Sequence, residues 1–290
     1  MNVLAEAPAL TVHRSRKLIP EFDLHRPQTT AEAVATKTAL GPGAVFMAGG
    51  IDVVNRMKFG VPVTDVIHLA GLADARLHEI AEEADGLRLG ALVTHDKLAT
   101  SPLVARHLPA LTQTWSEIAN IRVRCKGTIG GNLMAGDPAY DFTLTAMAAN
   151  ARLEFLETGG KSRFVAAADP GALANDGLLL AITLPSANTV RLWFDRSLRP
   201  VLTLVLGLDM TDGRISGGRV AIGCAYAKPI AVRLPLDEPL ASAELARQAD
   251  SLAQRVASDL PEPIGDPLAG SAYRRRMIQV LLRRNLAAVA

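Results

Sequence analysis

Two glycine-rich stretches decide how this chain is interpreted: Ala48-Gly49-Gly50-Ile51-Asp52 and Gly127-Thr128-Ile129-Gly130-Gly131-Asn132. The first stretch follows a short apolar run and precedes a helical pattern, and the second lies between two helical patterns. Glycines near a helix start let an anion approach bare backbone N–H groups, where the helix dipole adds positive potential. Either stretch alone is also typical of a tight turn. Together they predict two sites that converge on a single diphosphate.

The sequence around the first stretch predicts an alternation of short strands and helices. Thr29 and Glu32 have capping-box spacing, which predicts a helix over 30–40, and the apolar run over 44–48 predicts a buried strand. Further strands are expected over 64–69, 77–82 and 87–92, and further helices from Ile51, after Thr94, after Ser101 and over 110–119.

The sequence after the second stretch predicts a helix through Asn150 and then a sheet followed by helices. Strands are expected over 152–156, 178–184, 201–208 and 219–223, and helices over 244–257 and 272–288. Turn residues separate the last two strands, which predicts an antiparallel meander. A boundary at 185–189 divides the chain into an extension over 1–18, a domain over 19–187 and a second domain over 188–290.

Composition excludes several classes of function. The chain has 290 residues, and Lys+Arg 31 against Asp+Glu 29 gives a net charge of +2, too balanced for a charge-driven nucleic-acid or membrane binder. Its two cysteines, Cys125 and Cys224, lie far apart without a CxxC neighbour, which predicts neither disulfides nor a metal cluster and favours the cytoplasm. No apolar run reaches the roughly 18 residues of a spanning helix.

Most familiar catalytic signatures are absent from the sequence. It contains no GxxxxGK[ST], HExxH or GxSxG motif, and its six histidines show no pair at metal-ligand spacing. We therefore expect no catalytic residue and no metal ligand in this chain. His95 follows the predicted cap Thr94 and is a candidate base, but without a partner in the sequence a structural role is favoured. Beside the second glycine stretch, Asp137 and Asp141 are candidate acceptors for sugar hydroxyls.

The two glycine stretches resemble the FAD-binding motifs of the molybdenum hydroxylase flavoprotein family. The similarity runs through Met57-Lys58 after the first stretch, Ile121-Arg122 before the second and Pro138 to Asp141 after it. It extends from about Ile19 to the arginine-rich C-terminal helix. This family includes the medium subunits of carbon monoxide dehydrogenase and the flavin domain of xanthine dehydrogenase. The resemblance implies an α+β fold: a two-lobed FAD-binding domain of the vanillyl-alcohol-oxidase (PCMH) type, then a smaller domain of antiparallel sheet and helices.

The resemblance also implies which residues bind FAD. The first motif would contact the diphosphate from one side and the second from the other, Asp141 would hold ribose or ribityl hydroxyls, and Leu178 and Leu179 would lie near the isoalloxazine. Arg191 would also approach the flavin. The full implied set is Val45, Met47, Ala48, Gly49, Gly50, Ile51, Asp52, Val53, Thr128, Gly131, Asn132, Met134, Ala135, Asp141, Leu178, Leu179 and Arg191.

This chain departs from the family pattern at two places. Ile51 stands where the family often has Ser, Thr or His, so one side-chain contact to phosphate would be lost. Many members carry an Arg-x-x-Asp-aromatic-Ala run near the flavin, and here the run over 196–201 contains Arg199 and Pro200 instead. Arg199 would reverse the local charge beside the flavin, although a surface arginine is the simpler interpretation.

The function implied is that of an electron relay. The chain would be the FAD-carrying oxidoreductase subunit of a molybdenum hydroxylase, with no nucleic-acid partner and no membrane span. A large molybdopterin subunit would oxidise the substrate, and a small subunit with two [2Fe–2S] clusters would pass electrons to FAD and on to an external acceptor. These subunits would form a heterotrimer or its dimer. Two alternatives stay open: a self-sufficient FAD oxidase or dehydrogenase, and a scaffold subunit that has lost FAD.

Overall fold

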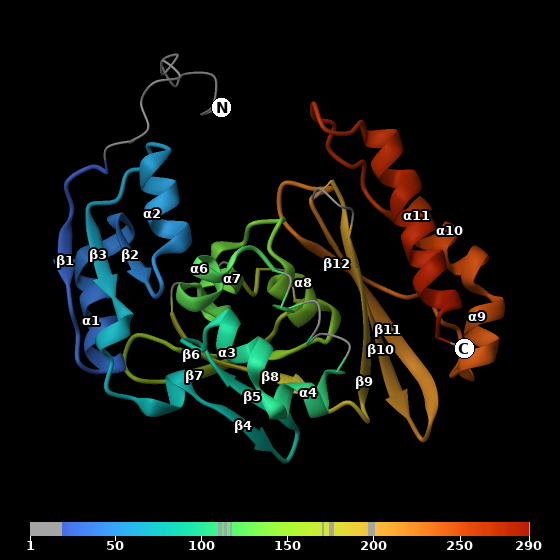
Figure 1. The fold of residues 1–290 in the computed structure, drawn as a ribbon, viewed down its shortest axis with the longest axis horizontal. Helices are drawn as coiled ribbons and strands as arrows, with labels where there is room; N and C mark the ends of the chain where they lie inside the picture. Colours follow the sequence, from blue (N-terminus) through green and yellow to red (C-terminus); the bar gives the residue numbers. More distant parts are fainter. Residues whose placement is uncertain are drawn as a thin grey trace.

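Within its described residues, the chain forms three β-sheets with helices between and outside them (Figure 1). The structure is a computed structural model that describes residues 19–196 and 201–289, apart from 110–111, 113–114, 117, 170 and 174–176. The predicted extension over 1–18 lies outside these residues. The predicted α+β class is confirmed, because strands and helices combine without the repeated crossover units of a parallel α/β fold.

The N-terminal part is a three-stranded parallel sheet in the order β1-β3-β2. Its elements are β1 (Asp23–His25), α1 (Thr30–Leu40), β2 (Ala44–Met47), α2 (Ile51–Lys58) and β3 (Asp65–His68). The predicted cap is present: the Thr29 hydroxyl accepts the N–H of Glu32 at 3.2 Å, and the Glu32 carboxylate accepts the N–H of Gln28 at 2.8 Å. These bonds satisfy donors at the start of α1, so the helix begins where the sequence predicts.

The middle part is a five-stranded antiparallel sheet in the order β4-β5-β8-β6-β7. Its strands are β4 (Ile80–Glu83), β5 (Gly86–Gly90), β6 (Arg152–Leu156), β7 (Ser162–Ala166) and β8 (Leu178–Pro185). The strand predicted over 77–82 is wrong at its start. The residues Ala75–His78 form a 3₁₀ turn instead, because the Asp74 carboxylate accepts the N–H of Arg76 at 2.9 Å.

Short helices lie between β5 and β6 in sequence and border the middle sheet. They are α3 (His95–Thr100), α4 (Pro102–His107), α6 (Ile121–Lys126), α7 (Ile129–Ala135) and α8 (Asp141–Ala148). The predicted caps Thr94 and Ser101 are confirmed, since each side chain accepts an N–H in the first turn of its helix. Half of the residues in the helix predicted over 110–119 lie outside the described set. Every residue of α8 is buried, so this helix forms the centre of the molecule.

The C-terminal part is a four-stranded antiparallel sheet covered by three helices. Its elements are β9 (Val190–Arg196), β10 (Thr203–Thr211), β11 (Arg214–Gly223), β12 (Ile230–Arg233), α9 (Ser242–Arg247), α10 (Ala249–Asp259) and α11 (Ser271–Ala287). The predicted meander is confirmed, with a positive φ at both Asp212 and Gly213 in the turn between β10 and β11. The single helix predicted over 244–257 is two helices that meet at Gln248. The described helices include none that is both long and apolar enough to cross a membrane.

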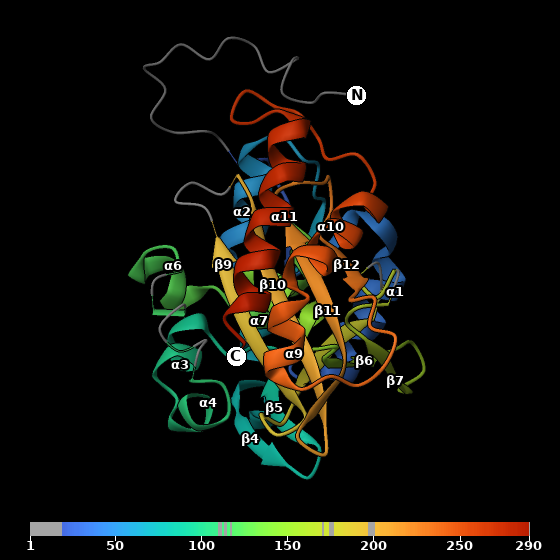
Figure 2. The same ribbon diagram turned by 90° about the vertical axis from the view of Figure 1, so that its right-hand side faces the viewer.

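The C-terminal sheet is buried on both faces. Leu204, Leu206 and Leu208 of β10 pack with the helices α9–α11, which cover the outer face (Figure 2). Val205, which points the other way, joins the core cluster that surrounds α8. On the same inner face, a Cβ on Gly207 would lie 2.1 Å from the carbonyl oxygen of Ala148. Glycine therefore allows α8 to pack directly on β10, and this contact joins the C-terminal sheet to the middle part.

Candidate functional site

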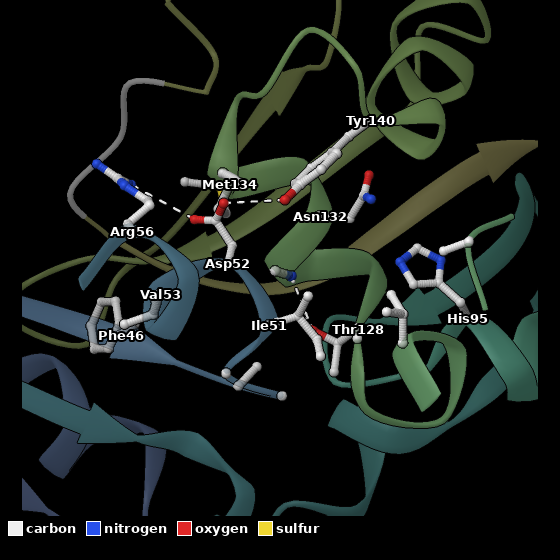
Figure 3. A pocket seen from close by; sticks show the side chains of 18 of the residues that line it. Phe46, Ile51, Asp52, Val53, Arg56, His95, Thr128, Asn132, Met134 and Tyr140 are labelled. Atoms are coloured by element: carbon white, nitrogen blue, oxygen red, sulfur yellow. Dashed lines mark hydrogen bonds and ion pairs between the residues drawn. The ribbon is translucent and has the colours of Figure 1, made fainter. Parts of the chain in front are cut away.

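A cavity of about 790 Å³ lies where the three parts meet. Its walls come from β2 and α2 of the N-terminal part, from α3, α6, α7 and the start of α8, and from β9 and β10 of the C-terminal sheet. Figure 3 shows Asp52 between Arg56 and Tyr140, with Asn132 beside Tyr140 and with Thr128 and His95 farther to the right. The cavity thus combines backbone from both glycine stretches with a few charged side chains and many apolar ones.

The two glycine stretches touch each other in this cavity. A Cβ placed on Gly49 would lie 1.6 Å from the carbonyl oxygen of Lys126 and 3.2 Å from the backbone nitrogen of Gly127. Only glycine permits this approach. The predicted convergence of the two stretches is therefore confirmed at the level of the backbone.

The first stretch presents free donors at the start of α2. Gly50 has φ 76° and precedes the helix without any side-chain cap. The first intrahelical bond is donated by Val54 to the carbonyl of Gly50 at 3.1 Å. Among the described residues, no acceptor takes the N–H groups of Ile51, Asp52 or Val53. These three donors and the helix dipole lie where the sequence predicts an anion site.

Most backbone donors of the second stretch are already occupied, and for these the prediction of bare N–H groups is wrong. Within residues 127–132, the N–H of Thr128 is the one that has no acceptor among the described residues. The N–H of Ile129 donates to the carbonyl of Val93 at 2.9 Å, and that of Gly130 to the carbonyl of Ala91 at 3.0 Å. The N–H of Gly131 donates to the Thr128 hydroxyl at 3.0 Å. The reason is a tertiary one: the chain after β5 pairs with the start of α7 through a bridge between Thr94 and Thr128.

The second stretch contributes side chains to the cavity instead. Thr128 and Asn132 both line it, and the Oδ1 atom of Asn132 is buried without a hydrogen-bond partner. A Cβ on Gly130 would lie 2.5 Å from the carbonyl oxygen of Ala91, so this glycine serves the packing of α7. The role of the second stretch is therefore to bring α7 close and to aim polar side chains at the space in front of α2.

Most of the predicted FAD-binding residues line the cavity: Val45, Ala48, Gly49, Gly50, Ile51, Asp52, Val53, Thr128, Gly131, Asn132, Met134, Ala135 and Asp141. Met47 lines a smaller neighbouring pocket of about 470 Å³. Leu178 and Leu179 are buried in the core, and Arg191 lies exposed on β9. Leu178, Leu179 and Arg191 do not line the cavity. Arg199 and Pro200 fall outside the described residues.

Asp52, Tyr140 and Arg56 connect the N-terminal part to the start of α8. The Tyr140 hydroxyl donates to the Asp52 carboxylate at 3.2 Å, and the Arg56 guanidinium lies 3.8 Å from the same carboxylate. Burial raises the pKa of Asp52 above its usual range, although Arg56 and Tyr140 oppose this. Burial and the nearby Asp52 charge raise the pKa of Tyr140 to about 12, so its hydroxyl stays protonated and donates.

Asp141 and Arg196 form a second pair, between α8 and β9. The Arg196 guanidinium donates to the Asp141 carboxylate at 3.2 Å, and both residues line the cavity. Burial raises the pKa of Asp141 to about 6, and Arg196 limits the increase by favouring the charged form. At neutral pH Asp141 is therefore mostly ionised and can accept hydrogen bonds from hydroxyl groups.

Sequence reasoning missed Arg56, Tyr140 and Arg196 as site residues. Arg56 carries a weak signal, because it lies four residues after Asp52 and so on the same helix face. Tyr140 immediately precedes Asp141 in the family-like run. Arg196 begins the run that departs from the family pattern, but only the pairing of β9 with β10 places it beside Asp141.

His95 lies in the wall of the cavity and is 3% exposed. Burial lowers the pKa of its imidazole to about 4, so the ring is neutral at neutral pH. The residues described include no group of three or more His, Cys, Asp or Glu side chains that could hold a metal ion.

Comparison with known proteins identifies the family. Residues 20–187 match the profile described as "FAD binding domain in molybdopterin dehydrogenase". The chain is 31% identical to the carbon monoxide dehydrogenase medium chain of Afipia carboxidovorans, over 92% of this chain and 96% of that one. It is 30% identical to the nicotine 6-hydroxylase medium subunit of Paenarthrobacter nicotinovorans, over 83% of this chain and 88% of that one.

A solved structure shows the same fold. A chain of reconstituted CO dehydrogenase from Oligotropha carboxidovorans superimposes with a TM-score of 0.80 at 26% identity, covering 94% of this chain and 100% of that one. Sequence and fold agree over nearly the whole length. The chain therefore belongs to the family of FAD-binding domains found in molybdopterin dehydrogenases.

Proposed function

We propose that this chain is the FAD-carrying electron-transfer subunit of a molybdenum hydroxylase complex in the cytoplasm. Electrons from [2Fe–2S] clusters of a small partner subunit would reach FAD in this chain and leave to an external acceptor. A large molybdopterin subunit would oxidise the organic substrate, and the three subunits would form a heterotrimer or its dimer. The observation that carries this proposal is the cavity in which the free donors of α2 face the second glycine stretch.

The residues of the cavity fit FAD. A diphosphate needs donors and positive potential, which the N–H groups of Ile51 to Val53 supply at the start of α2. Sugar and ribityl hydroxyls need acceptors such as the Asp141 carboxylate. Flat rings need apolar walls, and Val45, Ile118 and Met134 line the same cavity. Backbone, carboxylate and apolar groups are thus present together in one space.

The chain's own residues would bind and orient the cofactor. Gly49 keeps the two stretches in contact, and Gly50 turns the chain so that the first N–H groups of α2 face the cavity. Arg196 holds the Asp141 carboxylate in place through its ion pair. When bound, FAD supplies the capacity for both one-electron and two-electron transfer, which suits a junction between iron–sulfur clusters and an external acceptor.

The names of the relatives support the multi-subunit part of the proposal. The Afipia relative is the medium chain of a carbon monoxide dehydrogenase, and the Paenarthrobacter relative is the medium subunit of a nicotine 6-hydroxylase. This chain covers almost the full length of the Afipia relative, which fits a subunit of the same extent. The substrates of the two relatives differ, so this chain's substrate would be set by its large partner subunit.

A visible absorption spectrum tests the proposal. The full chain is purified alone and together with the products of neighbouring genes. We expect a flavin band in the isolated chain without substrate turnover, and turnover only in the assembled complex. Turnover of an organic substrate by the chain alone would favour a self-sufficient oxidase, and an active complex without flavin in this chain would favour a scaffold. Either result would overturn the proposal.

A further inference from the structure

His95 is a buried polar side chain that the protein leaves without a hydrogen-bond partner. It is the first residue of α3 and is 3% exposed. The Nδ1 atom is shielded from the cavity as well as from solvent, so Nε2 is the nitrogen that a ligand can reach. Figure 3 shows the imidazole extending toward the space that Thr128 and Asn132 also border. No described residue bonds Nε2, so this atom is open to a hydrogen bond from a ligand in the cavity.

Packing explains why a side chain of this size stands at position 95, but it does not explain why that side chain carries nitrogen atoms. The backbone N–H of His95 donates to the carbonyl of Gly127 at 3.0 Å. The ring edge lies so near Gly127 that a Cβ there would be 3.2 Å from the His95 Cδ2 atom. An apolar side chain of similar size would fill the same volume without burying an unpaired nitrogen atom. The imidazole therefore needs a second reason.

On one side of His95 the cavity wall is formed by apolar side chains. The carbonyl oxygen of Val123 borders the same face of Gly127, and Val123 lines the cavity together with Ile118 and Ala119. The Arg124 guanidinium holds this wall, because it donates to the carbonyl of Ile118 at 2.9 Å. A flat ring against these apolar side chains could form a directional hydrogen bond with the imidazole, and the Thr128 and Asn132 side chains border the same space.

The charge of the imidazole indicates which part of a dinucleotide it contacts. Burial lowers the pKa of His95 to about 4, so the ring is neutral at neutral pH. A neutral imidazole has one N–H donor and one acceptor nitrogen. This pair matches the donors and acceptors along the edge of a heteroaromatic ring, whereas a diphosphate is served by the N–H groups of α2.

We propose that His95 positions FAD through a hydrogen bond between its imidazole and the polar edge of one of the two heteroaromatic rings of the cofactor. The inference rests on the proposed function, since it concerns the same cavity. The proposed bond adds His95 to the FAD-binding residues, outside both glycine stretches. The ring that His95 contacts is the adenine or the isoalloxazine, and competition with ADP and with FMN separates the two.

The test measures FAD affinity of the full chain after the flavin has been removed. Titration followed by flavin fluorescence gives Kd for the unsubstituted chain, His95→Leu and His95→Gln. We expect His95→Leu to weaken binding about tenfold and His95→Gln, which keeps a donor and an acceptor, to recover part of the loss. The thermal unfolding midpoint of the flavin-free His95→Leu chain should not fall, because the substitution removes an unpaired buried nitrogen atom.

His107→Leu is the matched control. His107 belongs to α4, has a mostly buried side chain and does not line the cavity, so its loss should leave the Kd for FAD unchanged. Competition with ADP and with FMN identifies the ring: His95→Leu should weaken only ADP if the adenine is held, and only FMN if the isoalloxazine is held. A Kd for FAD within about twofold of the unsubstituted value would overturn the inference. Failure of the unsubstituted chain to bind FAD would instead overturn the proposed function.

Discussion

The two glycine stretches look alike in sequence but serve the cavity in different ways. In the first, Gly50 adopts a left-handed conformation and the N–H groups that follow it have no acceptor among the described residues. In the second, the N–H groups of Ile129, Gly130 and Gly131 already donate to protein oxygens. One stretch therefore offers free backbone donors of the kind that bind anions. The other is a packing site that allows close approach and presents side chains.

The difference shows that a glycine cluster at a helix start is ambiguous. Glycine there either exposes backbone to a ligand or admits another segment of the chain. At Gly130 the neighbour is the carbonyl of Ala91, which arrives from the chain after β5. The sequence contains no local mark of that neighbour. Substitutions that add a single Cβ separate the two uses.

The largest effect is expected for Gly49→Ala. Its Cβ would lie 1.6 Å from the carbonyl oxygen of Lys126, so the two stretches must separate. We expect the free energy of unfolding to fall by about 3 kcal/mol and FAD binding to be lost. Urea unfolding and flavin titration measure the two effects. Gly270→Ala is the control, because nothing lies within 4 Å of its added Cβ. Normal FAD affinity in Gly49→Ala would show that the contact is not required.

A second test uses the buried titratable group beside each stretch. Burial lowers the pKa of His95, which packs on Gly127, from 6.5 to about 4, so the unfolded chain binds more protons between these values. The His95 contribution to stability is therefore present above pH 6.5 and is lost as the pH falls toward 4. Burial raises the pKa of Asp52, beside Gly50, above 3.8. The Asp52 contribution to stability therefore has the opposite pH dependence: it is present below pH 3.8 and is lost as the pH rises above that value.

The free energy of unfolding of the flavin-free protein, measured between pH 4 and 7, tests these two predicted pH dependences. His95→Leu should remove a rise in stability with pH on the order of 2 kcal/mol. Asp52→Asn should make the stability of the protein rise more steeply with pH, because it removes the opposing contribution. Parallel pH profiles for the unsubstituted chain and both variants would contradict the assignment.

The smallest effects on stability and FAD affinity are expected for Gly50→Ala and Gly131→Ala, which compare the two stretches directly. At φ 76° an alanine at position 50 is strained, which should cost about 1 kcal/mol and turn the α2 donors away from the cavity. At position 131 a Cβ would lie 3.0 Å from the Thr128 hydroxyl, a contact that a small shift relieves. We expect flavin titration to show the greater loss of affinity for Gly50→Ala.

Gly213→Ala controls for strain in the comparison of these two variants. Gly213 also has a positive φ, but it lies in the turn between β10 and β11, away from the cavity. Its substitution should lower stability about as much as Gly50→Ala, by about 1 kcal/mol, and leave FAD affinity unchanged. Equal losses of affinity for Gly50→Ala and Gly131→Ala would show that the two stretches contribute in the same way.

Elements with strong local signals could be predicted from the sequence. The helix after Thr29 and the helices after Thr94 and Ser101 begin where their caps predict, because capping bonds form between neighbours in the chain. The strand β7 could not be predicted. Its first three residues are exposed, so it lacks the apolar alternation that marks a strand, and only pairing with β6 forms it.

In the candidate site, too, features that depend on neighbouring residues could be predicted and contacts between distant elements could not. The turn at Gly50 and the free donors of α2 could be predicted because they depend on one turn and the helix after it. Arg56, Tyr140 and Arg196 were missed because their partners come from other elements: Tyr140 reaches Asp52 across 88 positions, and Arg196 reaches Asp141 across 55. Leu178 and Leu179, implied by resemblance, lie in the core.

The sequence alone determined that the chain has two glycine stretches, one of them at the start of a helix able to bind an anion, and that both belong to an FAD-binding pattern. The tertiary structure decided which stretch keeps most of its donors free, and it placed His95 in the cavity wall with no side-chain hydrogen bond to any described residue. The physical reason is that a backbone N–H is free or occupied according to what packs against it. That neighbour can come from any part of the chain.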